Sequence, residues 1–158
     1  MHNTKIDIQR ETREKLIETL NTRLADAMDL KSQAKQAHWN VKGMNFIALH
    51  ELFDQVATEV EAHVDTLAER VTTLGGTALG TVRVAADNST LSQYPLEITD
   101  GHAHVEALSN ALADFGKKVR ENIDQADELG DMDTADIFTE ISRSIDKLLW
   151  FVEAHIQA

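Results

Sequence analysis

Histidine and carboxylate side chains recur between residues 38 and 69, and their types and spacing could bind metal ions. The chain has no cysteine, so any metal site must use imidazole and carboxylate ligands, which suit Fe(II), Zn(II) and Mn(II). The five candidates are His38, His50, Asp54, Asp65 and Glu69. Four of them form two pairs with a spacing of four residues, and the pairs are set 11 residues apart. This pattern places each pair on one face of a helix.

A single long helix is predicted to carry both pairs. Apolar residues recur at steps of three and four from Met44 to about Leu74, and no glycine or proline interrupts them. The helix should have about 30 residues and measure roughly 45 Å. Its apolar stripe consists of Leu49, Phe53, Val56, Val60, Val64, Leu67 and Val71. The line of four polar side chains lies beside this stripe, within a sector of about 100°.

The length of this helix prevents the two pairs from acting together in one chain. Asp54 and Asp65 should stand about 16 Å apart along the axis, too far to share one ion. His50 and Glu69 have the same midpoint as Asp54 and Asp65, between residues 59 and 60. An antiparallel copy related by a two-fold axis would place His50 opposite Glu69 and Asp54 opposite Asp65, completing two equivalent sites. The alternative is that these are ordinary solvated residues of a surface helix, and spacing alone does not decide between the two.

Composition predicts one soluble domain that attracts cations. The 158 residues suit a single domain at 10–158 after a short arm at 1–9. The start has no apolar segment of the signal-peptide kind, and no apolar run reaches membrane-spanning length, which favours a cytoplasmic location. A net charge of −12 argues against tight non-specific binding of nucleic acid, which needs basic residues to neutralise phosphates.

Three further amphipathic helices complete an all-α fold. The first should run from about residue 10 to 36, up to His38. Glycines 75 and 76 should end the second helix, and about 20 residues then lead to Pro95, with a short helix at 81–88. Thr99 or Asp100 should cap the third long helix, and Asp131 or Asp133 the fourth. The result is a four-helix bundle with a long crossover between its second and third long helices.

A bundle with one crossover is typical of ferritin-like folds. The usual di-iron version of that fold places a Glu-x-x-His pair on each of two helices. No glutamate in this chain is followed three positions later by histidine. A centre of that kind inside the bundle is therefore not predicted, which leaves the intersubunit arrangement.

Three segments resemble the Dps family of small ferritin-like proteins, and they read KSQAKQAHWNVKGMNFIALHELFD, VDTLAERVTTLGGTALGT and DTADIFTEISRSIDKLLWFVEAHI. The resemblance covers the chain from about residue 15. It implies a ferroxidase centre at a two-fold interface, with His38, His50 and Asp54 from one subunit and Asp65 and Glu69 from the other. It also implies a hollow homododecamer that oxidises Fe(II), preferably with hydrogen peroxide, and stores ferric mineral, which protects against oxidative damage. Zn(II) or another divalent ion could replace iron at the same ligands.

Several other residues have both a functional and an ordinary interpretation. Packing at a subunit contact is the favoured interpretation of Trp39, and the resemblance implies the other one, a place near the centre as an oxidisable neighbour. Glu51 and Glu59 are candidates for nucleating mineral on an inner surface, and otherwise they are solvated helix residues. His102 and His104 stand two apart at the start of the third long helix and point to different faces, and we expect both to lie on the surface.

A second acidic cluster surrounds the turn before the last helix. Its members are Asp124, Asp127, Glu128, Asp131, Asp133 and Asp136. Acidic side chains at a helix N-terminus interact favourably with the helix dipole, and this interaction would explain two or three of the six acids. The resemblance implies that this region surrounds three-fold pores, where Asp131, Asp133 and Asp136 would attract cations.

An alternative function is a nucleoid-associated architectural protein that compacts DNA, as some members of the family do. In the best-known cases that activity uses a lysine-rich terminal extension. Here Lys5 is the only lysine before Lys15, and the chain ends in EAHIQA. This departure argues against DNA binding.

Overall fold

The computed structural model describes residues 1–157, which form four long helices and one short one. In chain order these helices are α1 (Arg10–Asn40), α2 (Phe46–Thr73), α3 (Val82–Asn88), α4 (Gly101–Glu128) and α5 (Met132–Glu153). None of the helices in this described part is long and apolar enough to cross a membrane. The prediction of an all-α bundle with a short helix in its crossover is confirmed.

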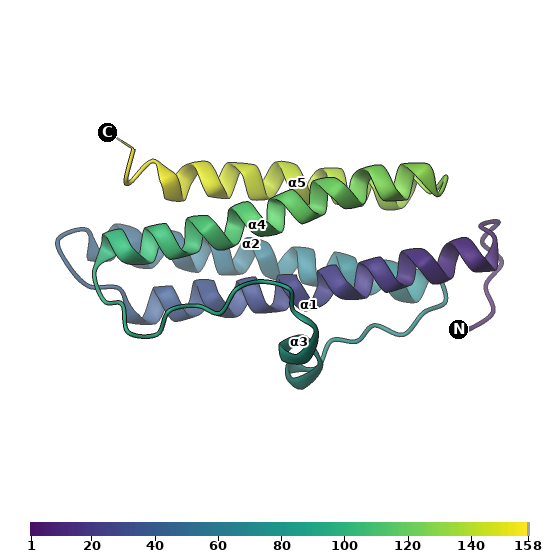
Figure 1. Ribbon diagram of the computed structural model, residues 1–158, viewed down its shortest axis with the longest axis horizontal. Helices are drawn as coiled ribbons and strands as arrows, with labels where there is room; N and C mark the ends of the chain where they lie inside the picture. Colours follow the sequence, from purple (N-terminus) through teal and green to yellow (C-terminus); the bar gives the residue numbers. More distant parts are fainter. Residues whose placement is uncertain (158) are drawn as a thin grey trace.

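The four long helices lie along one common axis, and α3 stands outside them (Figure 1). Helix α1 packs mainly against α2, and α4 packs mainly against α5. Between α2 and α4 the chain returns from one end of the bundle to the other, with α3 resting against α1. This connection makes α2 and α4 run in the same direction, as a one-crossover bundle requires.

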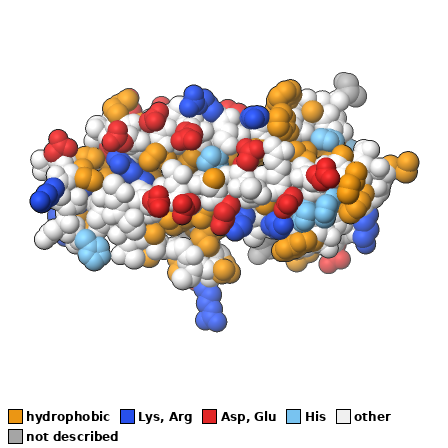
Figure 2. Space-filling view, turned by 180° about the vertical axis from the view of Figure 1, so that it is seen from behind, with side chains coloured by type: hydrophobic (Ala, Val, Ile, Leu, Met, Phe, Trp, Pro, Cys, Tyr) orange, Lys and Arg blue, Asp and Glu red, His pale blue; other side chains and the backbone are white. Residues whose placement is uncertain are grey.

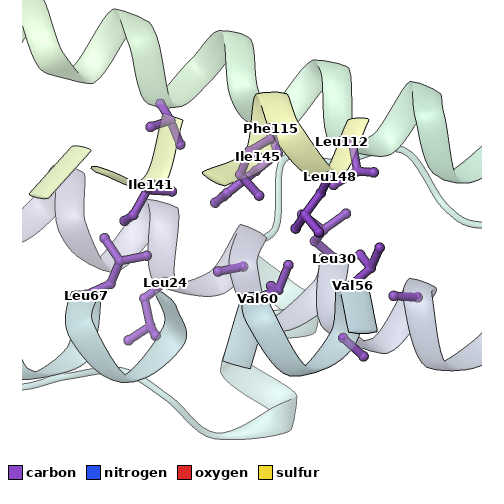
Figure 3. Close-up of a cluster of buried hydrophobic side chains, with 14 of the residues drawn as sticks. Leu24, Leu30, Val56, Val60, Leu67, Leu112, Phe115, Ile141, Ile145 and Leu148 are labelled. Atoms are coloured by element: carbon purple, nitrogen blue, oxygen red, sulfur yellow. The ribbon is translucent and has the colours of Figure 1, made fainter. Parts of the chain in front are cut away.

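One apolar core joins all four long helices (Figure 3). Leu24 of α1, Val60 of α2, Phe115 of α4 and Ile145 of α5 are all fully buried within it. Each long helix contributes a stripe with a helical period, and burial of these stripes is the main stabilising contribution. The core therefore fixes the rotation of α2 and turns its line of His50, Asp54, Asp65 and Glu69 away from the centre of the bundle.

Glycine ends α2 as predicted. Gly75 has a φ of +88°, a left-handed conformation in which a side chain would be strained. Its N–H donates to the carbonyl of Thr72 at 2.9 Å, and the N–H of Gly76 donates to Val71 at 2.9 Å. This pair of bonds is the Schellman arrangement, which satisfies the last free carbonyls of a helix. The guanidinium of Arg13 adds a bond to the carbonyl of Leu74 at 2.8 Å.

A buried carboxylate attaches the crossover to α1. Asp26 is completely buried, and it accepts hydrogen bonds from the backbone N–H of Thr90 at 2.6 Å and from its hydroxyl at 3.0 Å. Arg23 lies 3.1 Å from the same carboxylate. Burial of a charge is costly unless such partners surround it. The crossover is thus held at a defined place along α1.

Asp131 is the N-cap of α5, which confirms one of the two predicted caps, and its place at a pore stays a prediction. Its carboxylate accepts a bond from the N–H of Thr134 at 3.3 Å and so caps α5. The guanidinium Nη2 of Arg70 donates to both carboxylate oxygens at 2.8 Å, which joins α2 to α5. With 3% of its surface exposed, Asp131 has both oxygens engaged inside the chain. The acidic pattern could not show this because Arg70 is far away in sequence.

The ion pair of Asp131 makes stability depend on pH. Burial raises the pKa of this carboxyl, but the hydrogen bonds from Thr134 and Arg70 together outweigh it and hold the pKa below its ordinary value. A lowered folded-state pKa means that the stabilisation is present above the ordinary aspartate pKa of about 3.9. It is lost as the pH falls through the folded-state pKa.

Replacing Asp131 with asparagine should therefore destabilise the protein at neutral pH. The Asp131→Asn side chain keeps an oxygen for capping but leaves the Arg70 charge without its partner, which costs about 3 kcal/mol when the pair is buried. Guanidinium unfolding at a fixed protein concentration measures the difference, which should shrink as the pH falls below about 3.9. Asp133→Asn, an exposed neighbour, should change stability by less than about 0.5 kcal/mol. Equal stability of Asp131→Asn and wild type at pH 7 would contradict this account.

Candidate metal centre

His38 and His50 are held together by a reciprocal pair of hydrogen bonds. The Nδ1 atom of His38 lies 2.7 Å from the backbone carbonyl oxygen of His50, and Nδ1 of His50 lies 2.8 Å from that of His38. The two rings stack with centroids 3.8 Å apart and planes inclined by 20°. His38 comes from the last turn of α1 and His50 from the second turn of α2. The α1–α2 connection therefore brings them side by side.

These hydrogen bonds settle the tautomer of both rings. A carbonyl oxygen can only accept, so each Nδ1 must carry the proton and donate it. A neutral ring protonated at Nδ1 has its free lone pair at Nε2, the atom then available to a metal ion. A ring N–H donated to a backbone carbonyl is also the usual support of metal-binding histidines. The two Nε2 atoms thus fit a metal site. The backbone hydrogen bonds that hold the two rings in place could not be seen in the sequence.

The short connection between α1 and α2 makes this arrangement. Val41 caps α1 and is buried, and its N–H donates to the carbonyl of Ala37 at 3.0 Å. Lys42 then donates its N–H to the carbonyl of Thr99 at 2.9 Å, which ties the connection to the end of the crossover. The chain is anchored on both sides before α2 begins, so His50 meets the end of α1 at a fixed register.

Asp54 lies one turn beyond His50 and is bound by a lysine of α1. The Nζ atom of Lys35 lies 2.7 Å from Oδ1 of Asp54. The hydrogen bond from Lys35 lowers the pKa of Asp54, and burial opposes this only in part. The same Nζ atom lies 5.5 Å from the centre of the Trp39 ring, within the range of a cation–π contact.

Asp65 and Glu69 face outward on α2. Both are exposed, and within residues 1–157 neither carboxylate has an ion-pair or hydrogen-bond partner. In the same described part, no group of three or more His, Asp and Glu residues is gathered closely enough to hold an ion. One chain brings His38 and His50 together and leaves Asp65 and Glu69 at a distance along the helix. Their meeting across a two-fold axis stays a prediction.

Trp39 lies at the surface of the single chain. Its side chain is 66% exposed, although it directly follows His38. It lines a surface groove of about 500 Å³ together with Lys35 of α1 and Asp65 of α2. An exposed indole beside polar candidates is compatible with a subunit contact and with a place near the centre, so both interpretations of Trp39 stay predictions.

The other predicted acids are exposed to different degrees. Asp133 and Asp136 lie on the exposed side of the first turns of α5. Glu51 is exposed, whereas Glu59 is partly covered and accepts a hydrogen bond from the amide of Gln55 at 2.8 Å. Figure 2 shows acidic side chains along the length of one face of the molecule. The pore and nucleation roles of these four residues stay predictions.

The surface prediction is confirmed for His102 and wrong for His104. His104 is only 1% exposed, and its Nδ1 atom lies 2.7 Å from the hydroxyl of Tyr94 in the crossover. Its Nε2 atom is buried without a partner in the described chain, and burial lowers the pKa of the ring, which keeps it neutral. His104 stands one turn before Leu108 on the buried stripe of α4, so the helical period of the apolar residues contained a signal for its burial.

Comparison with known proteins gives one consistent result. A family model described as a ferritin-like domain matches residues 17–158. A protein of Agrobacterium fabrum named DNA protection during starvation protein is 47% identical over 156 residues, covering 99% of this chain and 96% of that protein. Among solved structures, the tetragonal form of Mycobacterium smegmatis Dps has a TM-score of 0.94 at 29% identity, covering 99% and 95% of the two chains. Dps from Microbacterium arborescens in its high-iron form has a TM-score of 0.86 at 32% identity, covering 92% and 95%.

Proposed function

Because the chain belongs to the Dps family of ferritin-like proteins, we propose that it is a ferroxidase whose substrate is Fe(II). It oxidises Fe(II), preferably with hydrogen peroxide, and stores the ferric product in a hollow dodecamer. The single observation that supports this most directly is the reciprocal hydrogen bonding of His38 and His50, which leaves both Nε2 lone pairs free. The high-iron form of the Microbacterium arborescens relative also supports iron as the substrate.

The residues of the centre have separate tasks in this reaction. The two neutral imidazoles bind Fe(II), and the carboxylates of Asp54, Asp65 and Glu69 stabilise the additional positive charge of Fe(III). Each of two Fe(II) ions gives up one electron. Hydrogen peroxide accepts both electrons and two protons, its O–O bond breaks, and two water molecules leave. Because the electrons arrive as a pair, no hydroxyl radical is released.

The centre is completed only when two subunits meet. On a rigid α-helix, residues 54 and 65 are separated by about 16 Å, so one copy of α2 cannot place both carboxylates on one ion. A two-fold axis near residues 59 and 60 creates two identical centres, each with His38, His50 and Asp54 from one subunit. Asp65 and Glu69 come from the other subunit, which agrees with their outward position in the single chain.

Two inactive variants should restore activity when they assemble together. His50→Ala/Asp54→Ala loses one half of every centre, and Asp65→Ala/Glu69→Ala loses the other half. A mixed dimer then contains one centre that lacks both halves and one that is intact. Random mixing should restore about a quarter of the wild-type oxidation rate, because half the dimers are mixed and each has one good centre. The rate is measured by ferric absorbance after peroxide is added to protein with Fe(II).

A matched mixture controls for non-specific recovery. His38→Ala mixed with His50→Ala/Asp54→Ala should stay inactive, since both variants lack the same half. The intersubunit assignment fails if the complementary mixture is no more active than its two components. It also fails if Asp65→Ala/Glu69→Ala alone oxidises Fe(II) at the wild-type rate.

We assign iron entry to the surface of Asp133 and Asp136, the exposed members of the acidic cluster at the start of α5. Asp133→Asn/Asp136→Asn should slow Fe(II) oxidation at low ionic strength, because removing carboxylates lowers the local concentration of cations. The difference should fade above about 0.1 M salt, where charges are screened beyond about 10 Å. Asp87→Asn, an exposed acid of α3, is the control and should behave as wild type. Equal oxidation rates for the double variant and wild type at low salt would contradict the assignment of iron entry to this surface.

DNA compaction is the alternative function, and the charge distribution argues against it. The chain carries 27 acidic and 15 basic residues, and residues 1–9 contain a single lysine. In a gel-shift titration at low salt we expect no retardation of duplex DNA, because binding depends on phosphate neutralisation. A variant with an added lysine-rich N-terminal segment is the positive control for the assay. Retardation by the unmodified protein at micromolar concentration would favour the alternative.

A further inference from the structure

Two carbonyl groups at the end of α1 lie against histidine side chains of other helices. The last carbonyls of an α-helix have no partner within the helix and need one elsewhere. The His38 carbonyl oxygen lies 2.8 Å from Nδ1 of His50, which comes from α2. The Asn40 carbonyl, at the last residue of α1, lies beside the buried ring of His104, which comes from α4. Two histidines from two different helices therefore contact the free end of α1.

The surroundings of His104 determine which of its nitrogens carries the hydrogen. Burial, the largest effect, lowers the pKa of the ring, while the Asp100 carboxylate and the backbone carbonyls of Ile98 and Asn40 raise it in part. These two carbonyl groups are thus next to the ring. The hydroxyl of Tyr94 lies 2.7 Å from Nδ1 and donates to it, so that Nε2 carries the ring hydrogen. The opposite tautomer would turn the Nε2 lone pair toward the carbonyl oxygens.

The Nε2–H group of His104 is a buried donor that faces the end of α1. Within residues 1–157 this atom has no well-formed hydrogen bond, and the neighbouring carbonyls of Ile98 and Asn40 are the acceptors on its side of the ring. A buried donor without a partner costs about 1–3 kcal/mol. The ring therefore favours positions of the last turn of α1 and of the crossover that keep these carbonyls close to α4.

The start of α4 also approaches α2 closely at this end of the bundle. A Cβ atom at Gly101 would stand 2.7 Å from Cδ1 of Leu49, an approach that the absence of a side chain allows. Leu49 directly precedes His50 in α2. The ring of His104 lies 6.5 Å from the ring of Phe53, one turn further along α2. His104 is thus placed between the end of α1 and the part of α2 that carries a candidate ligand.

We propose that His104, held in place by Tyr94, is a positioning residue of the metal centre. Its Nε2–H group fixes the carbonyl end of α1, and through this last turn it sets the spacing of His38 and His50. The inference rests on the proposed function, because it assumes that these two histidines bind the metal ion. His104 acts through the backbone, since its own ring is 1% exposed and lies inside the bundle.

The competing explanation is that His104 only fills space in the core, and a second buried histidine provides the comparison. His63 of α2 is 9% exposed, and its Nε2 atom lies 2.8 Å from the hydroxyl of Ser144 in the middle of α5. It also pairs with a hydroxyl group of another segment, but not at the end of α1. If His104 only fills space, loss of either histidine should have the same consequence for metal binding. If it positions the centre, only its own loss changes the affinity.

Titration with Co(II) at one fixed pH tests the inference without redox chemistry. Glutamine and methionine have side chains of similar length, but only glutamine can donate an N–H group. His104→Met should bind Co(II) about tenfold more weakly than wild type, as is typical for loss of a group that orients metal ligands. The visible absorption bands of the bound Co(II) should also shift, because the ligand geometry changes. His104→Gln, His63→Gln and His63→Met should stay close to wild type in both measurements.

Tyr94 gives an independent arm of the same experiment. Tyr94→Phe should weaken Co(II) binding when His104 is present, because the ring loses the hydroxyl that selects its tautomer. In the His104→Met background the same change should have no further effect, and this dependence measures the coupling of the two residues. Gel filtration shows whether each variant assembles. If His104→Met does not assemble, Tyr94→Phe decides, and wild-type affinity of that variant overturns the inference.

The outcomes separate this inference from the proposed function. If His50→Ala leaves Co(II) binding unchanged, the centre itself is wrongly placed. If His50→Ala weakens binding while His104→Met binds like wild type, the centre stands and the role of His104 is overturned. Equal weakening by His104→Gln and His104→Met also overturns it, because the donated N–H group would then have no importance. Equal weakening by His63→Met and His104→Met overturns it as well, because a loosened core would explain both.

Discussion

The stiffness of α2 is the constraint on which the other features depend. A helix rises about 1.5 Å per residue and cannot fold back on itself, so the polar pairs at 50 and 54 and at 65 and 69 stay apart. The apolar stripe fixes its rotation, because Phe53, Val56, Val60 and Leu67 are fully buried. The polar line cannot turn inward without exposing that stripe. A reaction that needs both polar pairs must therefore take place between two subunits. The orientation of α2 that buries its apolar stripe is also the one that the proposed intersubunit centre requires.

The contact between the end of α1 and the start of α2 fixes the positions of two imidazole rings. A histidine on a helix surface is free to rotate, and each ring here is fixed by the backbone of the other residue's helix. The bonds are mutual, so the α1–α2 connection and the ring positions support each other. Crossover contacts contribute from further away, since Thr99 anchors Lys42 in that connection. Geometry at the centre is thus supported by backbone groups, which do not change when side chains elsewhere are substituted.

Features of the fold that depend on local sequence could be predicted, and features that depend on packing between segments could not. The helices, the glycine at position 75 and the caps at Asp100 and Asp131 are determined by residues within a few positions of each other. The sequence also indicated four of the five candidate ligands, because their spacing is a property of one helix, whereas the resemblance to the family added His38. Burial of Asp131 was missed since its partner Arg70 is distant in sequence. Burial of His104 could have been read from its place one turn before Leu108, whereas its hydrogen bond with Tyr94 could not, because Tyr94 comes from the irregular crossover.

The contact between Lys35 and Asp54 also could not be predicted. It is a short-range electrostatic interaction, in contrast to the long-range effect of the net charge. The net charge of −12 acts over the whole surface and favours the approach of cations, within the screening length of the solution. The ammonium group of Lys35 acts at 2.7 Å and offsets the negative charge of a single carboxylate, that of Asp54. The long-range attraction of cations and the local positive charge at one carboxylate are therefore opposite contributions to the electrostatic potential of the same surface.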